Sequence, residues 1–342
     1  MKEPRLTVLM AVHNGGRFIG KAVQSILEQT FNDFEFLIID DASTDDSIEI
    51  IKAFHDPRIR LVRNRENMGL TRSLNFGLSQ ARGDYIARMD DDDLSLPTRL
   101  QAQMDFFEKN PSYGLVGTSY RYIDEEGRCI YEKILPRTSP EIKKALGITN
   151  QFAHASVMFP AQAIAAVGPY REFFRYAQDY DLFLRIAEKF EVYNIPEILT
   201  EWRVRLNSAS VKYRTLQNQY AHIARISASE RSKTGKDPVE RQDFSPDEIS
   251  SLEYLAAPSL LSRYRRKNIM ANSYYYWANF FQRREKSYPP GRRYAIRLLI
   301  KSFLANPFVF LFLISKRVVD SLKWRLRLNA RKADHNIQKE DT

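Results

Sequence analysis

The stretch that decides the fold is Tyr85-Ile86-Ala87-Arg88-Met89-Asp90-Asp91-Asp92-Asp93, in which a strand-like run ends in four consecutive carboxylates. Neighbouring carboxylates repel one another, so the cluster costs free energy unless a cation or hydrogen-bond donors offset its charge. Ligands of open α/β sheets collect at the carboxyl ends of the strands, which is where this cluster would lie. The position therefore favours a divalent-metal site, in which Mg²⁺ or Mn²⁺ is shared between carboxylates and the oxygens of a substrate phosphate.

Two other interpretations of the acidic cluster compete with this one. The first is a solvated acidic loop that caps the helix expected from Pro97, with Asp93 or Ser95 as the N-cap. The second is a calcium loop of the EF-hand type. Counted from Asp90, its sixth position is Ser95 where glycine is required, and its twelfth is Gln101 where a bidentate glutamate is required. The spacing excludes the calcium loop and leaves the solvated loop as the alternative.

Length and composition limit the classes of protein that need to be considered. The chain has 342 residues, 44% of them hydrophobic, which is enough for one large domain or two smaller ones. A single cysteine, Cys129, excludes an internal disulfide framework and a thiol-based zinc site, and it suits the reducing cytosol. We find no secretory leader and no run of roughly 18 to 20 apolar residues. The expectation is a cytoplasmic protein that is not integral to a membrane.

The charge balance is basic. The chain contains 52 Lys and Arg residues against 42 Asp and Glu residues, which gives a formal net charge of +10. This excess suits nucleic acid, anionic lipid or phosphorylated substrates, and composition alone does not choose among them.

Apolar patterning predicts that strands alternate with helices over the first 110 residues, which indicates a largely parallel sheet with right-handed crossovers. The predicted strands are 6–12, 34–39, 59–62 and 85–89, and the predicted helices are 18–29, one that begins at 43–45, 71–81 and 97–110. In such a sheet Asp40-Asp41 and the cluster at 90–93 both follow strands at the same edge. Two acidic groups at one edge are the most informative feature of the pattern.

The expected edge lacks the glycine-rich loops that bind nucleotides in other α/β folds. The loop after the first strand reads His13-Asn14-Gly15-Gly16-Arg17-Phe18, which matches neither G-x-G-x-x-G nor a P-loop with its Gly-Lys-Ser/Thr. A nucleotide bound at this edge would therefore be held through carboxylates and a metal.

Several motifs in consecutive order resemble family 2 glycosyltransferases of the GT-A fold, which are bacterial inverting enzymes that use nucleotide-diphosphate sugars. The matching segments are 8–14, 25–30, 34–45, 67–70, 83–93 and 97–100, together with Gln103. The resemblance covers the first two-thirds of the chain. It implies an α/β fold of the GT-A, Rossmann-like type, with a mostly parallel sheet flanked by helices and a C-terminal α-helical extension.

The resemblance assigns donor binding to the two acidic groups. In such enzymes the acid after the second strand accepts an N–H of the base, which here is Asp41, with Asp40 supporting the loop. The family's D-x-D pattern falls on Asp90 and Asp92, which would bind Mn²⁺ or Mg²⁺ between the two phosphates. Asp91 fills the middle position, where the family usually has a small residue. The structural alternative is that Asp40 and Asp41 only cap the next helix.

The resemblance also indicates a general base. The segment 176–185 resembles one in which Glu-Asp precedes a helix and the aspartate is the base. This chain has Gln178 in place of the glutamate and keeps Asp179. Asp179 would take the proton of an acceptor hydroxyl as its oxygen attacks the anomeric carbon opposite the diphosphate, and one such displacement inverts that centre. An N-cap role is the alternative for Asp179.

Other residues are expected at the donor site as well. Asn14 and Arg72 complete the donor-binding set, and Arg203 would grip the diphosphate. His154 would contact the acceptor or the diphosphate, although a structural histidine fits equally well. Arg205 stands where the family often has histidine, so the resemblance carries no role over to it.

The resemblance ends near residue 210, and helix formers dominate afterwards. We expect a catalytic domain over 1–213, a helical region over 214–330 and a polar tail over 331–342, with an exposed loop at 232–238. An apolar run at 303–314 with basic residues on both sides suits a helix at an anionic membrane surface, within 292–328. A core helix packed under the catalytic domain is the alternative.

The leading functional hypothesis is a metal-dependent transferase that moves a sugar from a UDP-sugar or related donor to a glycan or lipid-linked acceptor. It would build cell-surface polysaccharide or lipopolysaccharide as a peripheral protein on the inner face of the membrane. The alternatives are a sugar nucleotidyltransferase, whose glycine-rich, lysine-bearing loop is missing here, and a non-catalytic nucleotide-sugar-binding module. Nucleic acid is not expected as a partner, because no reading motif accompanies the basic residues.

Overall fold

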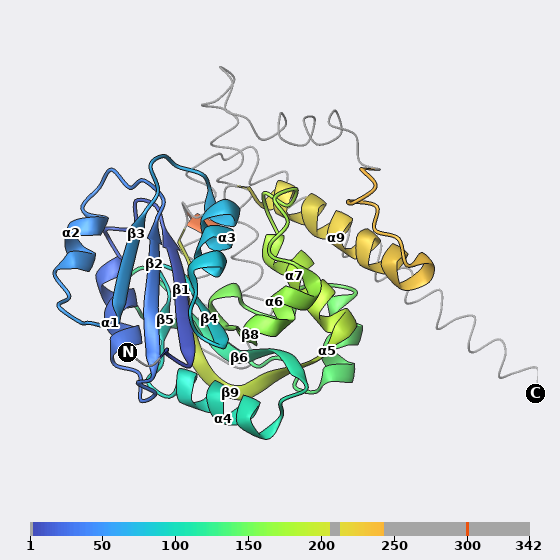
Figure 1. Ribbon diagram of the computed structural model, residues 1–342, viewed down its shortest axis with the longest axis horizontal. Helices are drawn as coiled ribbons and strands as arrows, with labels where there is room; N and C mark the ends of the chain where they lie inside the picture. The colour runs from blue at the N-terminus through green and yellow to red at the C-terminus, as the bar shows by residue number, and fades with distance from the viewer. Residues whose placement is uncertain (1–2, 206–212, 243–298, 301–342) are drawn as a thin grey trace, which may run out of the picture. The chain divides into compact units, whose positions relative to one another are not determined.

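The computed structural model describes residues 3–205, 213–242 and 299–300 (Figure 1). The chain divides into two units, and the first comprises residues 1–205 and 213–256. Its described strands are β1 Leu6–Val12, β2 Phe34–Asp40, β3 Ile59–Arg63, β4 Tyr85–Met89, β5 Leu94–Ser95, β6 Tyr113–Ile123, β7 Cys129–Lys133, β8 Met158–Pro160 and β9 Glu191–Arg203. Its described helices are α1 Ile19–Leu27, α2 Ser47–Lys52, α3 Leu70–Gln80, α4 Arg99–Lys109, α5 Ser139–Leu146, η1 His154–Ser156, α6 Ala161–Val167, α7 Gln178–Lys189 and α9 Arg214–Thr234.

The described strands form one sheet in the order β3-β2-β1-β4-β8-β6-β9-β5, with β7 paired to β6. The pairs β1–β2, β2–β3 and β1–β4 are parallel. Further along the sheet, β8 is antiparallel to both β4 and β6, and β9 is parallel to β6. The predicted α/β fold with helices flanking the sheet is confirmed. The strand-and-helix alternation produces the parallel half, and the antiparallel pairs that β5, β7 and β8 form make the whole sheet mixed.

Each face of the parallel half packs against its own layer of helices. Successive side chains of a strand point to opposite faces. Val8 and Met10 of β1 therefore pack in one core with Ile19 of α1 and Leu100 of α4. Leu9 packs in the other core, which α3, α5, α7 and α9 cover. Because both faces are buried, the ends of the strands are where a ligand can meet the sheet.

The second helix begins later than the pattern predicts. We expected it to open at 43–45, but α2 begins at Ser47. The hydroxyl of Ser43 accepts a hydrogen bond from the N–H of Asn14 at 3.0 Å, and the carboxylate of Asp45 accepts one from the N–H of Gly16 at 2.9 Å. The residues expected to cap the helix therefore join the loop after β2 to the loop after β1.

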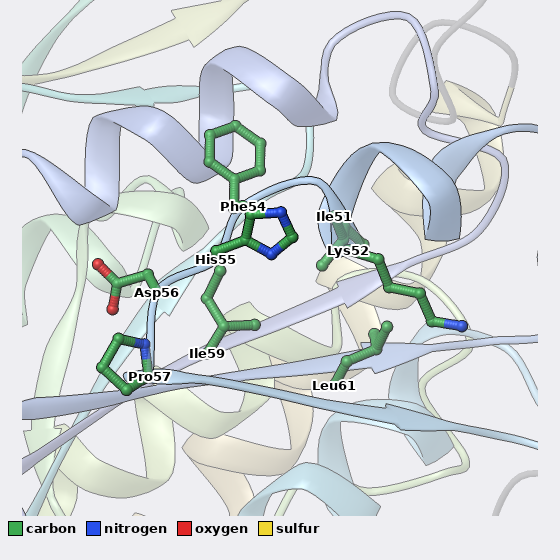
Figure 2. A pocket seen from close by; sticks show the side chains of 8 residues that line it. All are labelled: Ile51, Lys52, Phe54, His55, Asp56, Pro57, Ile59 and Leu61. Carbon is green, nitrogen blue, oxygen red and sulfur yellow. The ribbon is translucent and has the colours of Figure 1, made fainter.

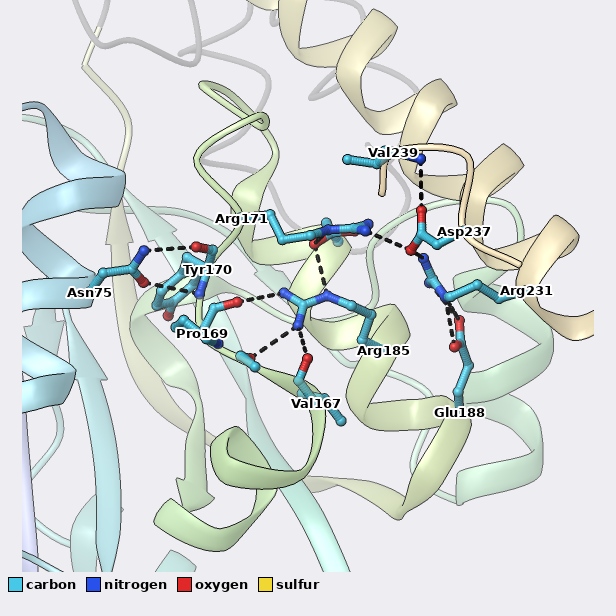
Figure 3. Close-up of polar contacts among 12 residues, drawn as sticks. Asn75, Val167, Pro169, Tyr170, Arg171, Arg185, Glu188, Arg231, Asp237 and Val239 are labelled. Carbon is cyan, nitrogen blue, oxygen red and sulfur yellow. Dashed lines mark hydrogen bonds and ion pairs between the residues drawn. The ribbon is translucent and has the colours of Figure 1, made fainter. Parts of the chain in front are cut away.

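A buried network of charged side chains holds α9 against α7 (Figure 3). Asp237 accepts hydrogen bonds from Arg171 and Arg231, each at 2.6 Å. Arg171 also donates to Asp181 of α7 at 3.0 Å, and Arg231 donates to Glu188 of α7 at 2.6 Å. Each of these buried or half-buried charges has a partner of opposite sign, which offsets the cost of its desolvation.

The prediction of an exposed loop at 232–238 holds for the exposure of residues 232–236 and is wrong for the helical residues 232–234 and for buried Asp237. Helix α9 continues to Thr234 and ends at Gly235, whose φ of +68° gives the left-handed conformation common after a helix. Asp237 is buried. The segment is polar because it contains a helix end and a buried carboxylate whose charge two arginines offset. Composition alone does not reveal these ion pairs.

The other C-terminal expectations lie mostly outside the described residues. This applies to the polar tail at 331–342 and to the membrane-surface segment at 292–328 apart from residues 299–300. The boundary expected after residue 213 stays a prediction, while Leu216 and Tyr220 of α9 pack into a core shared with α7. Among the helices that the structure describes, none has the length and apolar character needed to cross a membrane.

Candidate active site

Three loops leave the sheet side by side where β1, β2 and β4 end. In the parallel register Val12 pairs with Asp40, and Met10 pairs with Met89. Asn14, Asp41 and the acidic cluster therefore follow the ends of adjacent strands. The prediction that the two acidic groups share one edge of the sheet is confirmed.

Asn14 ties the first two of these loops together. Its φ is +57°, a left-handed conformation that asparagine tolerates better than most residues. Its side-chain oxygen accepts a hydrogen bond from the N–H of Thr44 at 2.8 Å. The next residue, Gly15, lies directly against the acidic cluster, because a Cβ at this position would overlap the carboxylate of Asp91. Asn14 and Gly15 thus shape the edge by bringing backbone close to carboxylates.

Asp41 is buried, and three donors hold its carboxylate. One oxygen, Oδ1, accepts from the side chain of Asn64 at 2.8 Å and from the N–H of Met68 at 2.9 Å. The other, Oδ2, accepts from the N–H of Gly69 at 2.8 Å. Burial by itself would raise the pKa of Asp41, but its hydrogen bonds outweigh burial and lower the pKa. Asp41 is therefore an ionised acceptor, and Oδ2 has capacity for one more donor.

The four aspartates of the cluster differ in their charge partners. Asp90 pairs with the buried guanidinium of Arg88 at 2.5 Å, and this pairing overcomes burial and lowers the pKa of Asp90. Burial and the neighbouring carboxylates raise the pKa of Asp91 to about 7 and that of Asp93 well above its usual range. Asp92 pairs with Arg205 at 2.6 Å, although burial keeps its pKa above the ordinary value. Two arginines thus offset part of the repulsion that the sequence predicts.

The structure gives Arg203 partners other than the expected diphosphate. Its backbone N–H donates to Oδ1 of Asp93 at 2.8 Å, and its Nε donates to the carbonyl oxygen of Asp92 at 2.8 Å. Its Nη1 donates to the carbonyl oxygen of Asp124 at 2.8 Å. These bonds fasten the end of β9 to the acidic cluster, so Arg203 holds the cluster in place. A contact with the diphosphate stays a prediction.

Arg205 comes two residues later and faces Asp92. Its guanidinium carbon lies 5.6 Å from the centre of the Phe18 ring, close enough for a cation–π contact. The same ring lies 4.8 Å from the guanidinium carbon of Arg203. Phe18 is buried and forms a wall beside the cluster. The residue that departs from the family pattern therefore contacts one of the two predicted metal ligands.

Asp179 lies in the first turn of α7, one residue after the helix begins. Ala177, just before the helix, has a left-handed φ of +58°, which is strained for alanine and sets the direction in which the helix starts. Burial, reinforced by the charge of Asp90, raises the pKa of Asp179 to about 6 despite an opposing hydrogen bond from Asn150 at 3.0 Å. A carboxylate with this pKa can accept a proton near neutral pH.

His154 is placed as a structural histidine would be. Its Nε2 shares a hydrogen bond of 2.9 Å with the hydroxyl of Tyr170, and its ring packs against Phe183. Burial and the charge of Arg88 lower the pKa of His154 to about 3, so the imidazole is neutral. Of the two sequence-based interpretations, the contacts favour the structural one. Contact with a substrate stays a prediction.

Arg72 lies near the start of α3, and its head is exposed. It pairs with Glu172 at 2.8 Å, and both side chains are more than half exposed. An exposed pair of this kind contributes little to stability. The guanidinium of Arg72 therefore exchanges partners at low cost, and its predicted role in donor binding stays a prediction.

The residues at this edge fit a divalent metal bound together with a diphosphate. Within the described ranges, no three His, Cys, Asp or Glu side chains are grouped as a ready-made metal site. Mg²⁺ in phosphate-handling enzymes takes only one or two carboxylates and completes its shell with phosphate oxygens and water. Asp90 and Asp92 offer oxygen ligands alone, which suit Mg²⁺ and Mn²⁺. The donor set therefore matches the predicted metal in both chemistry and number.

A separate hollow lies away from this edge (Figure 2). It has a volume of about 400 Å³ and is lined by residues between α2 and the middle of β3, namely Ile51, Lys52, Phe54, His55, Asp56, Pro57, Ile59 and Leu61. The loop that enters β3 forms part of its wall, so it lies toward the amino ends of the parallel strands. The site residues described above lie at the opposite ends and do not line it.

Comparisons with known proteins identify the family. The family model described as glycosyl transferase family 2 matches residues 7–172. EpsE of Bacillus subtilis, a protein named as a glycosyltransferase, is 34% identical over 281 residues, which span 78% of this chain and 95% of EpsE. The chain belongs to glycosyltransferase family 2. A second relative of this family 2 glycosyltransferase is the O-antigen biosynthesis glycosyltransferase WbnJ of Escherichia coli, 35% identical over 59% of the chain and 81% of WbnJ.

Solved structures agree with this assignment at the level of the fold. TarS residues 1–349 of S. aureus, solved with UDP-GlcNAc, has a TM-score of 0.55 at 14% identity and matches 81% of each chain. The mannosyltransferase PcManGT of Pyrobaculum calidifontis, solved with GDP-Man and Mn²⁺, has a TM-score of 0.52 at 17% identity and matches 90% of this chain and 89% of PcManGT. The family 2 glycosyltransferase described here therefore has the predicted GT-A fold.

Sequence patterns missed several residues that shape the site. Asn150 donates to Asp179 and Asn64 donates to Asp41, each from a distant part of the chain. Arg88 is buried beneath Asp90, and a charged residue inside an apolar strand was the available signal for it. For the two asparagines nothing in the spacing gives a signal, because the contacts depend on how loops close over the sheet.

Proposed function

We propose that this glycosyltransferase is an inverting, metal-dependent enzyme that transfers a sugar from a nucleotide-diphosphate donor, a UDP-sugar in the first instance, to an acceptor hydroxyl. The observation that carries the proposal is the environment of Asp179. It is a half-buried carboxylate with a raised pKa, held by Asn150 and close enough to Asp90 for the two charges to interact. A base next to the metal-binding cluster is the arrangement that a direct displacement at the anomeric carbon requires.

Each group at the edge has a separate task in this mechanism. Asp41 accepts an N–H of the base through the free capacity of Oδ2, and the loop at 64–69 fixes its orientation. Asp92 and Asp90 hold Mn²⁺ or Mg²⁺, which when bound neutralises charge on the departing diphosphate. Asp179 takes the proton of the acceptor hydroxyl, and Asn150 keeps the carboxylate oriented. The imidazole of His154, which the Tyr170 hydroxyl holds, stays neutral and adds no charge near Asp90.

The acceptor is proposed to be a growing glycan or a lipid-linked saccharide of a cell-surface polysaccharide. The support comes from relatives whose names place them in such pathways, including WbnJ in O-antigen biosynthesis and AmsE of Erwinia amylovora in amylovoran biosynthesis. A lipid-linked acceptor would bring the enzyme to the inner face of the membrane. The basic and apolar segment at 292–328 is proposed to bind the anionic surface there.

The experiment that tests this function is a nucleotide-release assay with UDP-, GDP- and dTDP-sugars, each with Mn²⁺, Mg²⁺ or EDTA. Wild type is compared with Asp92→Asn and with Asp84→Asn, a matched control. Asp84 is exposed and immediately precedes β4, at the end opposite the acidic cluster. We expect metal-dependent release from one donor, lost in Asp92→Asn and retained in Asp84→Asn. Release that EDTA leaves unchanged would contradict metal dependence.

A further inference from the structure

Arg205 and Asp92 form a close ion pair at the centre of the site. Nε of Arg205 lies 2.6 Å from Oδ2 of Asp92, and both side chains are mostly shielded from solvent. Among the described residues this Nε has no hydrogen-bond partner, so its N–H is not aligned on the carboxylate despite the short distance. The contact is therefore held by charge and not by a directed hydrogen bond. Another cation can replace Arg205 in a contact with Asp92 that depends on charge alone.

Arg203 shows what a fixed arginine looks like in the same place. Its Nε and Nη1 donate to the backbone carbonyls of Asp92 and Asp124, both at 2.8 Å. These bonds anchor the backbone two residues before Arg205. The guanidinium of Arg205 forms an ion pair with a side chain, whereas the guanidinium of Arg203 forms hydrogen bonds with backbone carbonyls. The backbone next to Arg205 is therefore held in place, while the guanidinium of Arg205 can exchange its ion-pair partner.

The ring of Phe18 gives the guanidinium of Arg205 a surface along which it can move. The guanidinium carbon lies 5.6 Å from the ring centre. Phe18 is buried, and its ring also contacts Arg203 and Arg17, each at 4.8 Å. A planar guanidinium retains part of its attraction to an aromatic face as it shifts across it. Leaving Asp92 therefore does not require Arg205 to leave the site.

We infer that Arg205 and the divalent metal compete for Asp92, and that the donor diphosphate releases this carboxylate by drawing the guanidinium to its phosphate oxygens. Without donor, the guanidinium repels a cation from Oδ2 of Asp92. With donor, the phosphates offer Arg205 a planar, bidentate partner, and the metal takes Asp92. The inference rests on the proposed metal-dependent function. It makes metal and donor bind as a pair.

The inference is tested by Mn²⁺ binding, measured from the electron paramagnetic resonance signal of free Mn²⁺, with and without UDP, GDP or dTDP. The proteins are the full-length wild type, Arg205→Gln, Arg205→Lys and the control Arg82→Gln, an exposed arginine before β4. We expect Arg205→Gln to bind Mn²⁺ alone at least about tenfold more tightly than wild type. We expect the diphosphate to tighten Mn²⁺ binding in wild type by a factor at least about ten times larger than in Arg205→Gln.

Arg205→Lys separates the effect of the positive charge from that of the planar guanidinium. It also provides the test if Arg205→Gln does not fold. Lysine still repels the metal, so Mn²⁺ alone should bind as weakly as to wild type, while the diphosphate should tighten binding less because lysine lacks the fork. Arg82→Gln should match wild type. Equal Mn²⁺ dissociation constants for wild type and Arg205→Gln in all conditions would overturn the inference and leave metal use intact. Failure of every protein to bind Mn²⁺ with any diphosphate would overturn metal use as well.

Discussion

The carboxylate of Asp179 accepts a hydrogen bond from the side chain of Asn150 at 3.0 Å, across 29 residues of chain. Asn150 belongs to the loop between α5 and η1, whereas Asp179 lies in the first turn of α7. The amide favours the charged carboxylate, burial favours the neutral acid, and the result is a pKa of about 6. Both the orientation and the proton affinity of the proposed base therefore depend on this pair.

Replacing Asn150 by alanine should shift the pH dependence of turnover. Loss of a donor to the charged form raises the pKa of Asp179 above about 6, so the ascending limb of kcat moves to higher pH. We also expect kcat at the plateau to fall about tenfold, because the carboxylate loses its orientation. The measurement is kcat against pH for wild type, Asn150→Ala and Asn32→Ala, an exposed asparagine before β2. A lower rate with an unmoved midpoint would show that Asn150 does not act on the base.

Asp179 should make stability fall as the pH rises. Its pKa of about 6 in the folded protein exceeds the ordinary value for aspartate, so the folded state binds the proton more tightly than the unfolded state. The stabilisation is complete below pH about 4 and is lost as the pH rises through about 6. From pH 5 to pH 8, we expect the free energy of unfolding of wild type to fall by on the order of 1 kcal/mol relative to that of Asp179→Asn. The measurement is urea unfolding at the two pH values. An equal difference at both pH values would contradict the raised pKa.

Asn64 should matter for donor binding and not for chemistry. Its side chain donates to Oδ1 of Asp41 at 2.8 Å and to the hydroxyl of Ser73 at 2.9 Å. Asn64→Ala removes one of the bonds that orient Asp41, which costs on the order of 1 kcal/mol. We expect the KM for the donor to rise roughly 5- to 10-fold with kcat within twofold of wild type. A fall in kcat at an unchanged KM would place Asn64 in the catalytic step instead.

Asp237 should be essential to the attachment of α9. Asp237→Asn removes a buried carboxylate that accepts from both Arg171 and Arg231 (Figure 3). Breaking a buried charge pair costs about 3 kcal/mol or more. We expect this loss in urea unfolding, against less than about 0.5 kcal/mol for the exposed control Asp84→Asn. A neutral effect of Asp237→Asn would show that the remaining partners, Asp181 and Glu188, compensate the arginines without it.

The parallel half of the fold could be predicted because each of its signals is local. The apolar run Leu6–Val12 is a strand with the predicted bounds, and Tyr85–Met89 is another. Helix starts are harder to predict because capping residues have other possible partners. Ser43 and Asp45 bond the loop after β1, which moves the start of α2 to Ser47. The burial of Asp237 was missed for a similar reason. One of its partners, Arg171, is distant in the sequence, and the other, Arg231, lies within α9.

The acidic residues of the site could be located from the order of the strands, but their charge states could not. The sequence shows four aspartates in a row at 90–93, and the structure shows that Arg88 and Arg205 pair with two of them. Arg205 had no role by resemblance, because the family often has histidine at its position. Its contact with Asp92 depends on the end of β9 being fastened to the cluster through Arg203. A contact between segments this far apart in the sequence produces no periodic pattern from which it could be predicted.

The measurement that tests the central claim most directly is turnover of Asp179→Asn beside wild type and Asp84→Asn, with the donor that the release assay selects. Loss of a general base lowers the rate by roughly 10²–10⁴-fold. We expect a fall of this size in kcat for Asp179→Asn at pH 7 and above, where Asp179 of wild type is ionised, with the donor dissociation constant within threefold of wild type and Asp84→Asn unchanged. Asp179→Asn with turnover within a few-fold of wild type would contradict the account, because Asp179 would then not be the base.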